Sequence, residues 1–448
     1  MISKKFSEHL WMPFTSHKDF VENPPVIIEK GKGVYLYDEN GDKYIDGIGS
    51  WWVSIFGHNH PEITSAVRNQ LDKIEHVLMA GCVSTATLEL VEVLGGLLPP
   101  GLKKIFFSDD GSTSVEVAMK IALQYHQING SKSRTKFVSL DGGYHGDTLG
   151  AASVGSIPRY HGIFHSTFKK QYYADSPYCY RCPAGKEKNT CNAECMDSLE
   201  AILKSHGEEI AACIFEPMVQ GAVGMRMYPP KVLKKIFQLC NRYEILTIAD
   251  EVAMGLGRTG KMFACDHAGV VPDMMCLAKG LTAGYMPLAV TAVKEKIHAA
   301  FCGDHLSNKT FEHGHTFTGN PLAAATACAT LNLLVKSQIP DSITTVMEYF
   351  RNRMEVLFKD LECVGDVRCL GMAGALDIVK NKTTKEPYTP QERFSYRVCN
   401  KAREKGLLIR PLANCIYFMP AFIITKEEID IMLSATLDSI IEVMNEQV

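Results

Sequence analysis

The chain has 448 residues, 46% of them hydrophobic, so it can bury a sizeable core in up to about three domains. Its 47 lysines and arginines nearly balance 50 aspartates and glutamates, and the net charge of −3 gives no electrostatic basis for binding nucleic acid or an acidic membrane. The N-terminus lacks the apolar core of a signal peptide, and no apolar run reaches the roughly 18 residues of a transmembrane helix. The 15 scattered cysteines are typical of reduced thiols, so we expect a cytoplasmic protein.

The first sixty residues contain a predicted hairpin and an adjacent pair of tryptophans. Residues 33–46 place apolar positions on both sides of a turn at Asn40 and Gly41, a pattern that predicts a β-hairpin. Trp51 and Trp52 follow in an apparently extended segment. Adjacent side chains of an extended chain point to opposite sides, so we expect only one tryptophan to face a given pocket. Core packing is the alternative for both.

Helix-like and strand-like segments alternate over residues 61–325, the order that predicts a mostly parallel sheet covered by helices. After one short strand, Gly111 and Ser112 open an apolar-periodic helix. Free N–H groups and the helix dipole at such a start favour a phosphate group. Serine is also an ordinary helix cap, and the carboxylates of Asp109 and Asp110 disfavour an anion unless they turn away.

Two later strands each end in a chemically active side chain. The apolar run at residues 245–249 leads to Asp250, and the run at residues 274–278 leads to Lys279 in a glycine-bearing turn. A carboxylate can keep a pyridine nitrogen protonated, and an amine can form a Schiff base with an aldehyde. Pyridoxal 5′-phosphate (PLP) needs both groups from its protein. Either residue alone is more often a cap or a solvated surface group, but together they predict a PLP site.

Other polar and aromatic residues also follow predicted strands. One strand leads to Tyr144, His145 and Asp147, and another leads to Glu216. Ligands of open α/β sheets bind at the carboxyl ends of the strands, so we expect these side chains to gather near Lys279. An aromatic ring there can stack on a flat cofactor, although loop aromatics often serve only as lids on a core.

Beyond about residue 326, helices alternate with short strands. Residues 406–410 and 415–419 are predicted to form a strand pair joined by residues 411–414. Arg410 ends the first of these strands, a position that plain surface exposure does not explain. A guanidinium can bind a carboxylate through two parallel hydrogen bonds, so Arg410 is a candidate carboxylate ligand.

Four cysteines lie close together in a polar segment. Cys179 and Cys182 form one pair, and Cys191 and Cys195 form a second pair after eight intervening residues. This spacing could hold zinc or an iron–sulfur cluster, and a solvated insert with reduced thiols is the alternative. We therefore predict no firm metal site and keep the quartet as the weaker hypothesis.

Two long motifs resemble a known family. Residues 249–263 (ADEVAMGLGRTGKMF) and 278–291 (AKGLTAGYMPLAVT) resemble the class III, or ω-, aminotransferases of PLP fold type I. The likeness runs from about residue 11 to about residue 424. The YHGDT motif and the IRP…IY pattern resemble the branch that converts 8-amino-7-oxononanoate to 7,8-diaminononanoate in biotin biosynthesis.

The resemblance implies an α/β fold with a mostly parallel seven-stranded sheet flanked by helices, and a smaller α+β domain built from both termini. The implied division is residues 1–60 for the N-terminal part of the small domain and active site, 61–325 for the large PLP-binding domain and 326–448 for the C-terminal small domain. It also implies a homodimer that shares its active sites, with small molecules as the other partners.

The resemblance further assigns individual residues. The implied catalytic residues are Lys279, Asp250 and Tyr144. The residues implied to hold PLP are Gly111, Ser112, Tyr144, His145, Glu216, Asp250, Lys279 and Thr316, the last reaching the neighbouring subunit's phosphate. The residues implied to contact substrates are Phe14, Trp51, Trp52, Asp147, Arg258, His315, Arg410 and Tyr417.

The amino donor stays open between S-adenosylmethionine and lysine. S-adenosylmethionine is the usual donor in the family, but its users carry tyrosine where this chain has Phe14, and they tend to carry proline where it has His315. Phe14 lacks the hydroxyl that would bond to the donor or relay a proton. His315 resembles the lysine-using branch.

Two rival functions remain. Another ω-aminotransferase, acting on a diamine or ω-amino acid, would share Lys279 and Asp250 but lack the tryptophan pair and the pattern that contains Arg410 and Tyr417. A non-catalytic binding protein on the same fold would have lost the lysine or the aspartate, and this chain retains both.

Overall fold

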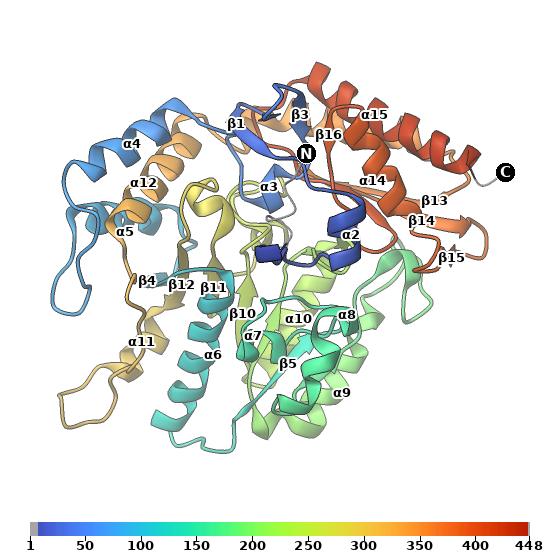
Figure 1. Ribbon diagram of the computed structural model, residues 1–448. Coiled ribbons are helices and arrows are strands. Elements are labelled where there is room, and N and C mark those ends of the chain that lie inside the picture. The colour runs from blue at the N-terminus through green and yellow to red at the C-terminus, as the bar shows by residue number, and fades with distance from the viewer. Residues whose placement is uncertain (1–7, 447–448) are drawn as a thin grey trace.

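The computed structural model in Figure 1 describes residues 8–446. A central sheet is flanked by helices, and elements from the two ends of the chain lie side by side at the top right of the view. There β3 (Lys43–Asp46) pairs in parallel with β16 (Leu407–Leu408), so residues separated by more than 360 positions share a sheet. The N-terminal segment is therefore part of the structure formed by the C-terminal residues.

The central sheet has seven strands in the order β4-β12-β11-β10-β7-β5-β6. Only β12 runs antiparallel to its neighbours, so the predicted mostly parallel seven-stranded sheet is confirmed. In sheet order the strands are Leu102–Ser108, Ala289–Lys294, Met274–Leu277, Leu246–Asp250, Ile210–Phe215, Lys136–Leu140 and Tyr172–Ala174.

The middle strands are mostly apolar because helices cover both faces of the sheet. Every residue of β7, β10 and β11 is buried. The α-helices of the described residues are α2 (His17–Glu22), α4 (Pro61–Leu71), α5 (Thr85–Leu97), α6 (Gly111–Ile128), α7 (Leu149–Ser153), α8 (Pro158–His161), α9 (Asp197–His206), α10 (Pro230–Arg242), α11 (Glu295–Phe301), α12 (Pro321–Lys336), α13 (Thr344–Phe358), α14 (Phe394–Glu404) and α15 (Lys426–Asn445). The short segment labelled α3 (Gly49–Trp52) has left-handed backbone angles.

The smaller sheets confirm one prediction and correct another. The hairpin of β2 and β3 forms as expected, with Gly41 in the left-handed region (φ 88°) that its turn requires. Residues 406–410 and 415–419 do not pair as strands: β16 joins β3, whereas β17 joins β14. The remaining strands are β1 (Ile28–Lys32), β2 (Tyr35–Asp38), β8 (Val219–Gln220), β9 (Arg226–Met227), β13 (Val364–Leu370), β14 (Ala373–Asn381), β15 (Glu386–Pro387) and β17 (Cys415–Phe418).

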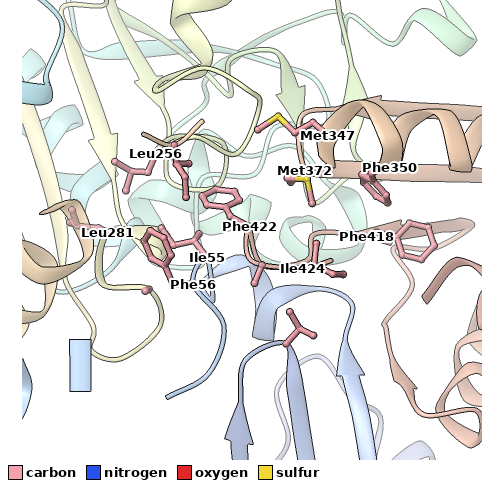
Figure 2. Packing of buried hydrophobic residues seen from close by; sticks show 14 of the residues in the cluster. Ile55, Phe56, Leu256, Leu281, Met347, Phe350, Met372, Phe418, Phe422 and Ile424 are labelled. Atoms are coloured by element: carbon pink, nitrogen blue, oxygen red, sulfur yellow. The ribbon is translucent and has the colours of Figure 1, made fainter. Parts of the chain in front are cut away.

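One apolar cluster joins the N-terminal segment, the loops after β10 and β11, and the C-terminal segment (Figure 2). At its centre the ring of Phe422 meets Phe56 edge-on at 6.4 Å, close to Leu256 and Leu281. The cluster holds the loops beyond the sheet against both ends of the chain. The division at residues 1–60, 61–325 and 326–448 stays a prediction.

No single helix within residues 8–446 has both the length and the apolar composition to cross a membrane. One pair of helical segments, Pro321–Lys336 with Asp341–Phe358, meets these two criteria together, with a bend of 60° between them.

Candidate active site

Lys279 and Asp250 lie at the carboxyl ends of the neighbouring strands β11 and β10 and line one cavity of about 410 Å³, the inner cavity. This arrangement follows from the parallel pairing, which brings the two strand ends to the same edge of the sheet. The other predicted residues that line the inner cavity are Trp52, Gly111, Ser112, Tyr144, His145 and Glu216. The structure confirms the predicted position of these side chains around Lys279. Their roles stay predictions.

The Lys279 amine lies against an aromatic wall. Its Nζ is 4.6 Å from the centre of the Trp52 ring. Burial lowers the pKa of the amine, and the carboxylates of Asp250 and Glu216 oppose that shift. A lowered pKa increases the fraction of neutral amine, the form that attacks an aldehyde and accepts a proton.

Asp250 is held in one orientation by two hydrogen bonds. Its Oδ2 lies 2.8 Å from Nδ1 of His145, and its Oδ1 accepts the N–H of Val252 at 3.1 Å. The opposite ring nitrogen of His145, Nε2, is buried without a hydrogen-bond partner among the described residues. His145 therefore orients the Asp250 carboxylate by a hydrogen bond. The carboxylate can still bind a positively charged group in the cavity.

Glu216 is a buried carboxyl group beside this pair. One of its oxygens accepts the N–H of Tyr144 at 3.1 Å, and the other accepts the N–H of Gly221 at 2.8 Å. Burial raises the pKa of Glu216 to about 7, against an ordinary value of 4.5. Glu216 is consequently protonated in the folded protein over a pH range in which the unfolded chain ionises it.

We expect Glu216→Gln to remove the destabilising contribution that burial of Glu216 makes as the pH rises from about 4.5 to about 7. Below this range Glu216 is protonated in both states and contributes no difference. As pH rises, only the unfolded chain ionises, so folding becomes less favourable by at most roughly 3 kcal/mol at and above pH 7. Urea unfolding at pH 5 and pH 8 should show the variant gaining stability relative to wild type at the higher pH. Glu92→Gln, on the exposed face of α5, is the control; an equal gain at both pH values would contradict the prediction.

The start of α6 fits a phosphate group. Asp110 caps its own helix by accepting the N–H of Thr113 at 2.9 Å, and Asp109 pairs with His315 at 2.9 Å. Both carboxylates that could repel an anion are thereby engaged elsewhere. A Cβ at Gly111 would lie 2.8 Å from Val252, so the close approach there requires glycine. The first N–H groups of this 18-residue helix have no intrahelical acceptors and border the cavity.

A second cavity of about 710 Å³, the outer cavity, adjoins the first and shares Trp52, Tyr144 and Lys279 with it. Other predicted residues that line it are Phe14, Trp51, Asp147, Arg410 and Tyr417. The hydroxyl of Tyr144 donates to Asp147 at 2.7 Å. Tyr144 thus stands between the two cavities, and its predicted contact with the PLP ring stays a prediction.

The tryptophan pair corrects the expectation of an extended chain. Ser50, Trp51 and Trp52 have φ angles of 46°, 71° and 76°, so this segment is a tight left-handed turn. The alternation of an extended chain does not apply there, and both tryptophans line the outer cavity. A run of three non-glycine residues in this region is unfavourable unless the surrounding structure supports it.

Arg410 and Tyr417 border the outer cavity from the C-terminal segment. Arg410 donates a hydrogen bond to the carbonyl of Phe14, and its guanidinium lies 5.9 Å from the centre of the Trp51 ring. Tyr417 is almost fully buried with its ring edge-on to Trp52 at 6.0 Å. Burial raises the pKa of the Tyr417 hydroxyl, which stays protonated.

Arg258 lies apart from the two cavities, and its predicted substrate contact stays a prediction. Its side chain is fully buried, lines neither cavity, and donates to the carbonyls of Pro420 at 2.6 Å and Met372 at 3.4 Å. It also lies over the ring of Phe422 at 4.8 Å. Burial lowers the pKa of this guanidinium to about 9. Arg258 therefore connects the loop after β10 to the C-terminal segment.

His315 and Thr316 also lie outside both cavities. His315 reaches the inner cavity only through Asp109, which lines it. Thr316 is exposed, and its predicted role in a neighbouring subunit's site stays a prediction.

The cysteine quartet does not form a metal site in this structure. Within residues 8–446 no three histidine, cysteine, aspartate or glutamate side chains are placed to hold a metal ion. The thiols of Cys179 and Cys191 donate to the backbone carbonyls of Pro177 at 4.0 Å and Lys188 at 3.6 Å, and Cys195 is buried in an apolar cluster. The segment instead binds the C-terminal residues, because Arg181 donates to the carbonyl of Lys385 and Lys385 to that of Tyr180.

Several residues that line the cavities were not predicted from the sequence, and two of them carry polar side chains suited to a ligand. Arg159 and Tyr160 line the outer cavity from α8. The only signal in the sequence was an arginine beside an aromatic residue after Pro158. This pattern does not distinguish a binding residue from an ordinary surface residue.

Residues 17–440 match the class-III aminotransferase family. The match spans most of the chain. The chain belongs to the class-III aminotransferases. The adenosylmethionine-8-amino-7-oxononanoate aminotransferase of Geobacter sulfurreducens is 44% identical over 433 residues, 96% of this chain and 95% of that protein. The crystal structure of the adenosylmethionine-8-amino-7-oxononanoate aminotransferase from Methanocaldococcus jannaschii is 40% identical, with a TM-score of 0.92 over 97% of each chain. A PLP-bound amine transaminase structure from an uncultivated Pseudomonas species is 34% identical, with a TM-score of 0.91 over 97% of this chain and 99% of that one.

As a class-III aminotransferase, the chain is a PLP-dependent transaminase. When bound, PLP supplies an aldehyde that takes up the amino group and a protonated ring that withdraws electrons from the reacting carbon. The inner cavity fits this cofactor: it presents an amine of lowered pKa on Lys279, an oriented carboxylate on Asp250 and the free helix start at Gly111 and Ser112.

Proposed function

We propose that this transaminase converts 8-amino-7-oxononanoate to 7,8-diaminononanoate in biotin biosynthesis. One observation carries the proposal: the outer cavity extends from Lys279 along the aromatic side chains of Trp51, Trp52 and Tyr417, and it contains the guanidinium of Arg410. The substrate has a ketone and an amine near one end, an apolar chain in the middle and a carboxylate at the other end. In the cavity the Lys279 amine lies against Trp52 and the Arg410 guanidinium lies near Trp51, so the tryptophan pair stands between a reactive and a cationic group, as the apolar chain stands between the ketone and the carboxylate.

Each residue has a specific proposed task. Lys279 would hold the cofactor through its aldehyde, and its amine would move a proton to and from the reacting carbon. Asp250 keeps the ring nitrogen protonated, with His145 holding the carboxylate in place. The first N–H groups of α6, at Gly111 and Ser112, bind the cofactor phosphate. Tyr144 and Glu216 line the inner cavity and would contact the bound cofactor.

The outer cavity binds the substrates in turn. Trp51, Trp52 and Tyr417 contact the apolar chain, Arg410 binds the distal carboxylate, and Asp147 lies near the substrate amine. The donor is S-adenosylmethionine or lysine. Phe14 lines the cavity and offers no hydroxyl to a donor, which is an argument for lysine.

We further propose a cytoplasmic homodimer with shared sites, in which Thr316 reaches the neighbouring phosphate. Apolar side chains near Thr316 support a covered face: Phe317 and Leu78 are 59% and 56% exposed in the single chain. All fifteen cysteines are free thiols, as in a reducing compartment.

The proposal is tested by incubating PLP-loaded enzyme with 8-amino-7-oxononanoate and either S-adenosylmethionine or lysine. We expect mass spectrometry to detect 7,8-diaminononanoate with at least one donor. The change in the visible absorption of the bound cofactor after adding one donor alone identifies which donor is competent. Conversion of simple amines or diamines without any 7,8-diaminononanoate would instead establish another ω-aminotransferase.

Arg410→Gln should raise the KM for 8-amino-7-oxononanoate by about 10- to 100-fold, because a charge-assisted hydrogen bond to a carboxylate contributes roughly 1.5–3 kcal/mol. The kcat should change much less, since the carboxylate is remote from the reacting carbon. Steady-state kinetics at saturating donor measures both constants. A fall in kcat with an unchanged KM would contradict the assignment.

A further inference from the structure

Two guanidinium groups, not one, line the outer cavity. Arg159 lies in α8 and lines the cavity together with Arg410. Both arginines also line an adjoining cleft of about 770 Å³ between the N-terminal residues and the C-terminal segment. No hydrogen bond or ion pair joins Arg159 to any side chain that the structure describes. Arg159 is therefore a cationic group with its donors available to a ligand.

The charges of both arginines act on the same side chain, the hydroxyl of Tyr160. Burial raises the pKa of the Tyr160 hydroxyl, the charges of Arg159 and Arg410 oppose this, and the charge of Asp147 adds to it. The ring of Tyr160 lies 5.3 Å from Phe14, whose carbonyl accepts the hydrogen bond from Arg410. The contact between Tyr160 and Phe14 thus links the part of the cavity wall next to Arg159 in sequence with the part that binds Arg410.

The charges in this cavity are unbalanced without a ligand. Asp147 is the acidic residue that lines it, and its carboxylate already accepts the hydroxyl of Tyr144. Two like charges beside one cavity repel each other, and an anion between them relieves that repulsion. A carboxylate has two oxygens and about four acceptor positions, so one carboxylate can bind both guanidinium groups.

We propose that Arg159 is a second carboxylate-binding residue, which holds the distal carboxylate of the acceptor together with Arg410. This inference rests on the proposed function and deepens it. The substrate class is an amino ketone whose carboxylate is separated from the reacting carbon by an apolar chain. An acceptor without the carboxylate would leave both positive charges unneutralised and would bind more weakly.

The test compares Arg159→Gln, Arg410→Gln and the double variant with 8-amino-7-oxononanoate and with its methyl ester, at saturating donor. For the acid, we expect Arg159→Gln to raise KM by about 10-fold, equivalent to roughly 1.4 kcal/mol, with kcat within about 2-fold of wild type. For the ester, KM should be the same in wild type and Arg159→Gln. The double variant should lose less than the product of the two single effects, because both residues bind one group.

Arg403→Gln is the matched control. Arg403 lines the adjoining cleft but not the outer cavity, and it binds the carbonyl of Pro24. The KM of the Arg403→Gln variant for the acid should equal that of wild type. The inference is overturned if Arg159→Gln behaves like Arg403→Gln, or if it shifts the KM of acid and ester equally. If wild type fails to convert the acid at all, the proposed function itself falls, and this result is distinct because it appears before any variant is compared.

Discussion

Lys279→Ala should reduce turnover by at least about 10³-fold, the largest effect of any single substitution in this chain. The residue has two tasks, the covalent attachment of the cofactor and the transfer of the proton. No neighbouring side chain replaces it in the inner cavity, where Nζ faces the Trp52 ring. The variant should also lose the visible absorption band that a covalently attached cofactor produces.

The measurement combines steady-state rates, absorption spectra and peptide mass analysis after borohydride treatment. Wild type should carry the cofactor mass on the peptide that contains Lys279. Lys261→Ala, at an exposed position in the loop between β10 and β11, should retain both the mass and the rate. Cofactor mass on another lysine, or turnover near the wild-type rate in Lys279→Ala, would show that the site has been assigned to the wrong residue.

Asp250→Asn should lower kcat by about 10²- to 10³-fold, in line with the loss of one preorganised electrostatic group. Asparagine has nearly the same shape and can still accept the hydrogen bond from His145, so the fold and cofactor binding should persist. What disappears is the negative charge that keeps the ring nitrogen protonated.

A rescue experiment separates this role from a structural one. Loading Asp250→Asn with a PLP analogue methylated on the ring nitrogen supplies a permanent positive charge and should restore part of the lost rate. Asp72→Asn, at the exposed end of α4, provides the control for a neutralised aspartate. Equal rates with PLP and with the analogue would indicate that Asp250 acts through structure and not through the proton.

Local patterns predicted most of the large elements because helices and strands follow short-range rules. The apolar runs that lead to Asp250 and Lys279 form β10 and β11, since a strand buried on both faces needs mostly apolar residues. The Asn40–Gly41 turn forms the predicted hairpin because glycine adopts the left-handed conformation there. The family motifs likewise identified residues that line the inner cavity.

Long-range packing decided what these rules could not. The segments at 406–410 and 415–419 look like one hairpin, yet they enter different sheets because β3 and β14 offer them separate edges. Arg258 has the sequence context of an active-site residue, but the C-terminal carbonyls of Met372 and Pro420 draw its side chain into the core.

The sequence by itself therefore determined the α/β class, the order of the strands along the chain and the chemistry at two strand ends, since each depends on neighbouring residues. Only the tertiary structure decided that Trp51 and Trp52 share one cavity and that Arg159 joins Arg410 beside it. The tryptophan turn is stable only where distant segments hold three left-handed residues in place, and the two arginines are 251 positions apart. Contacts of that kind depend on how the ends of the chain pack around the sheet, and short-range periodicity carries no information about them.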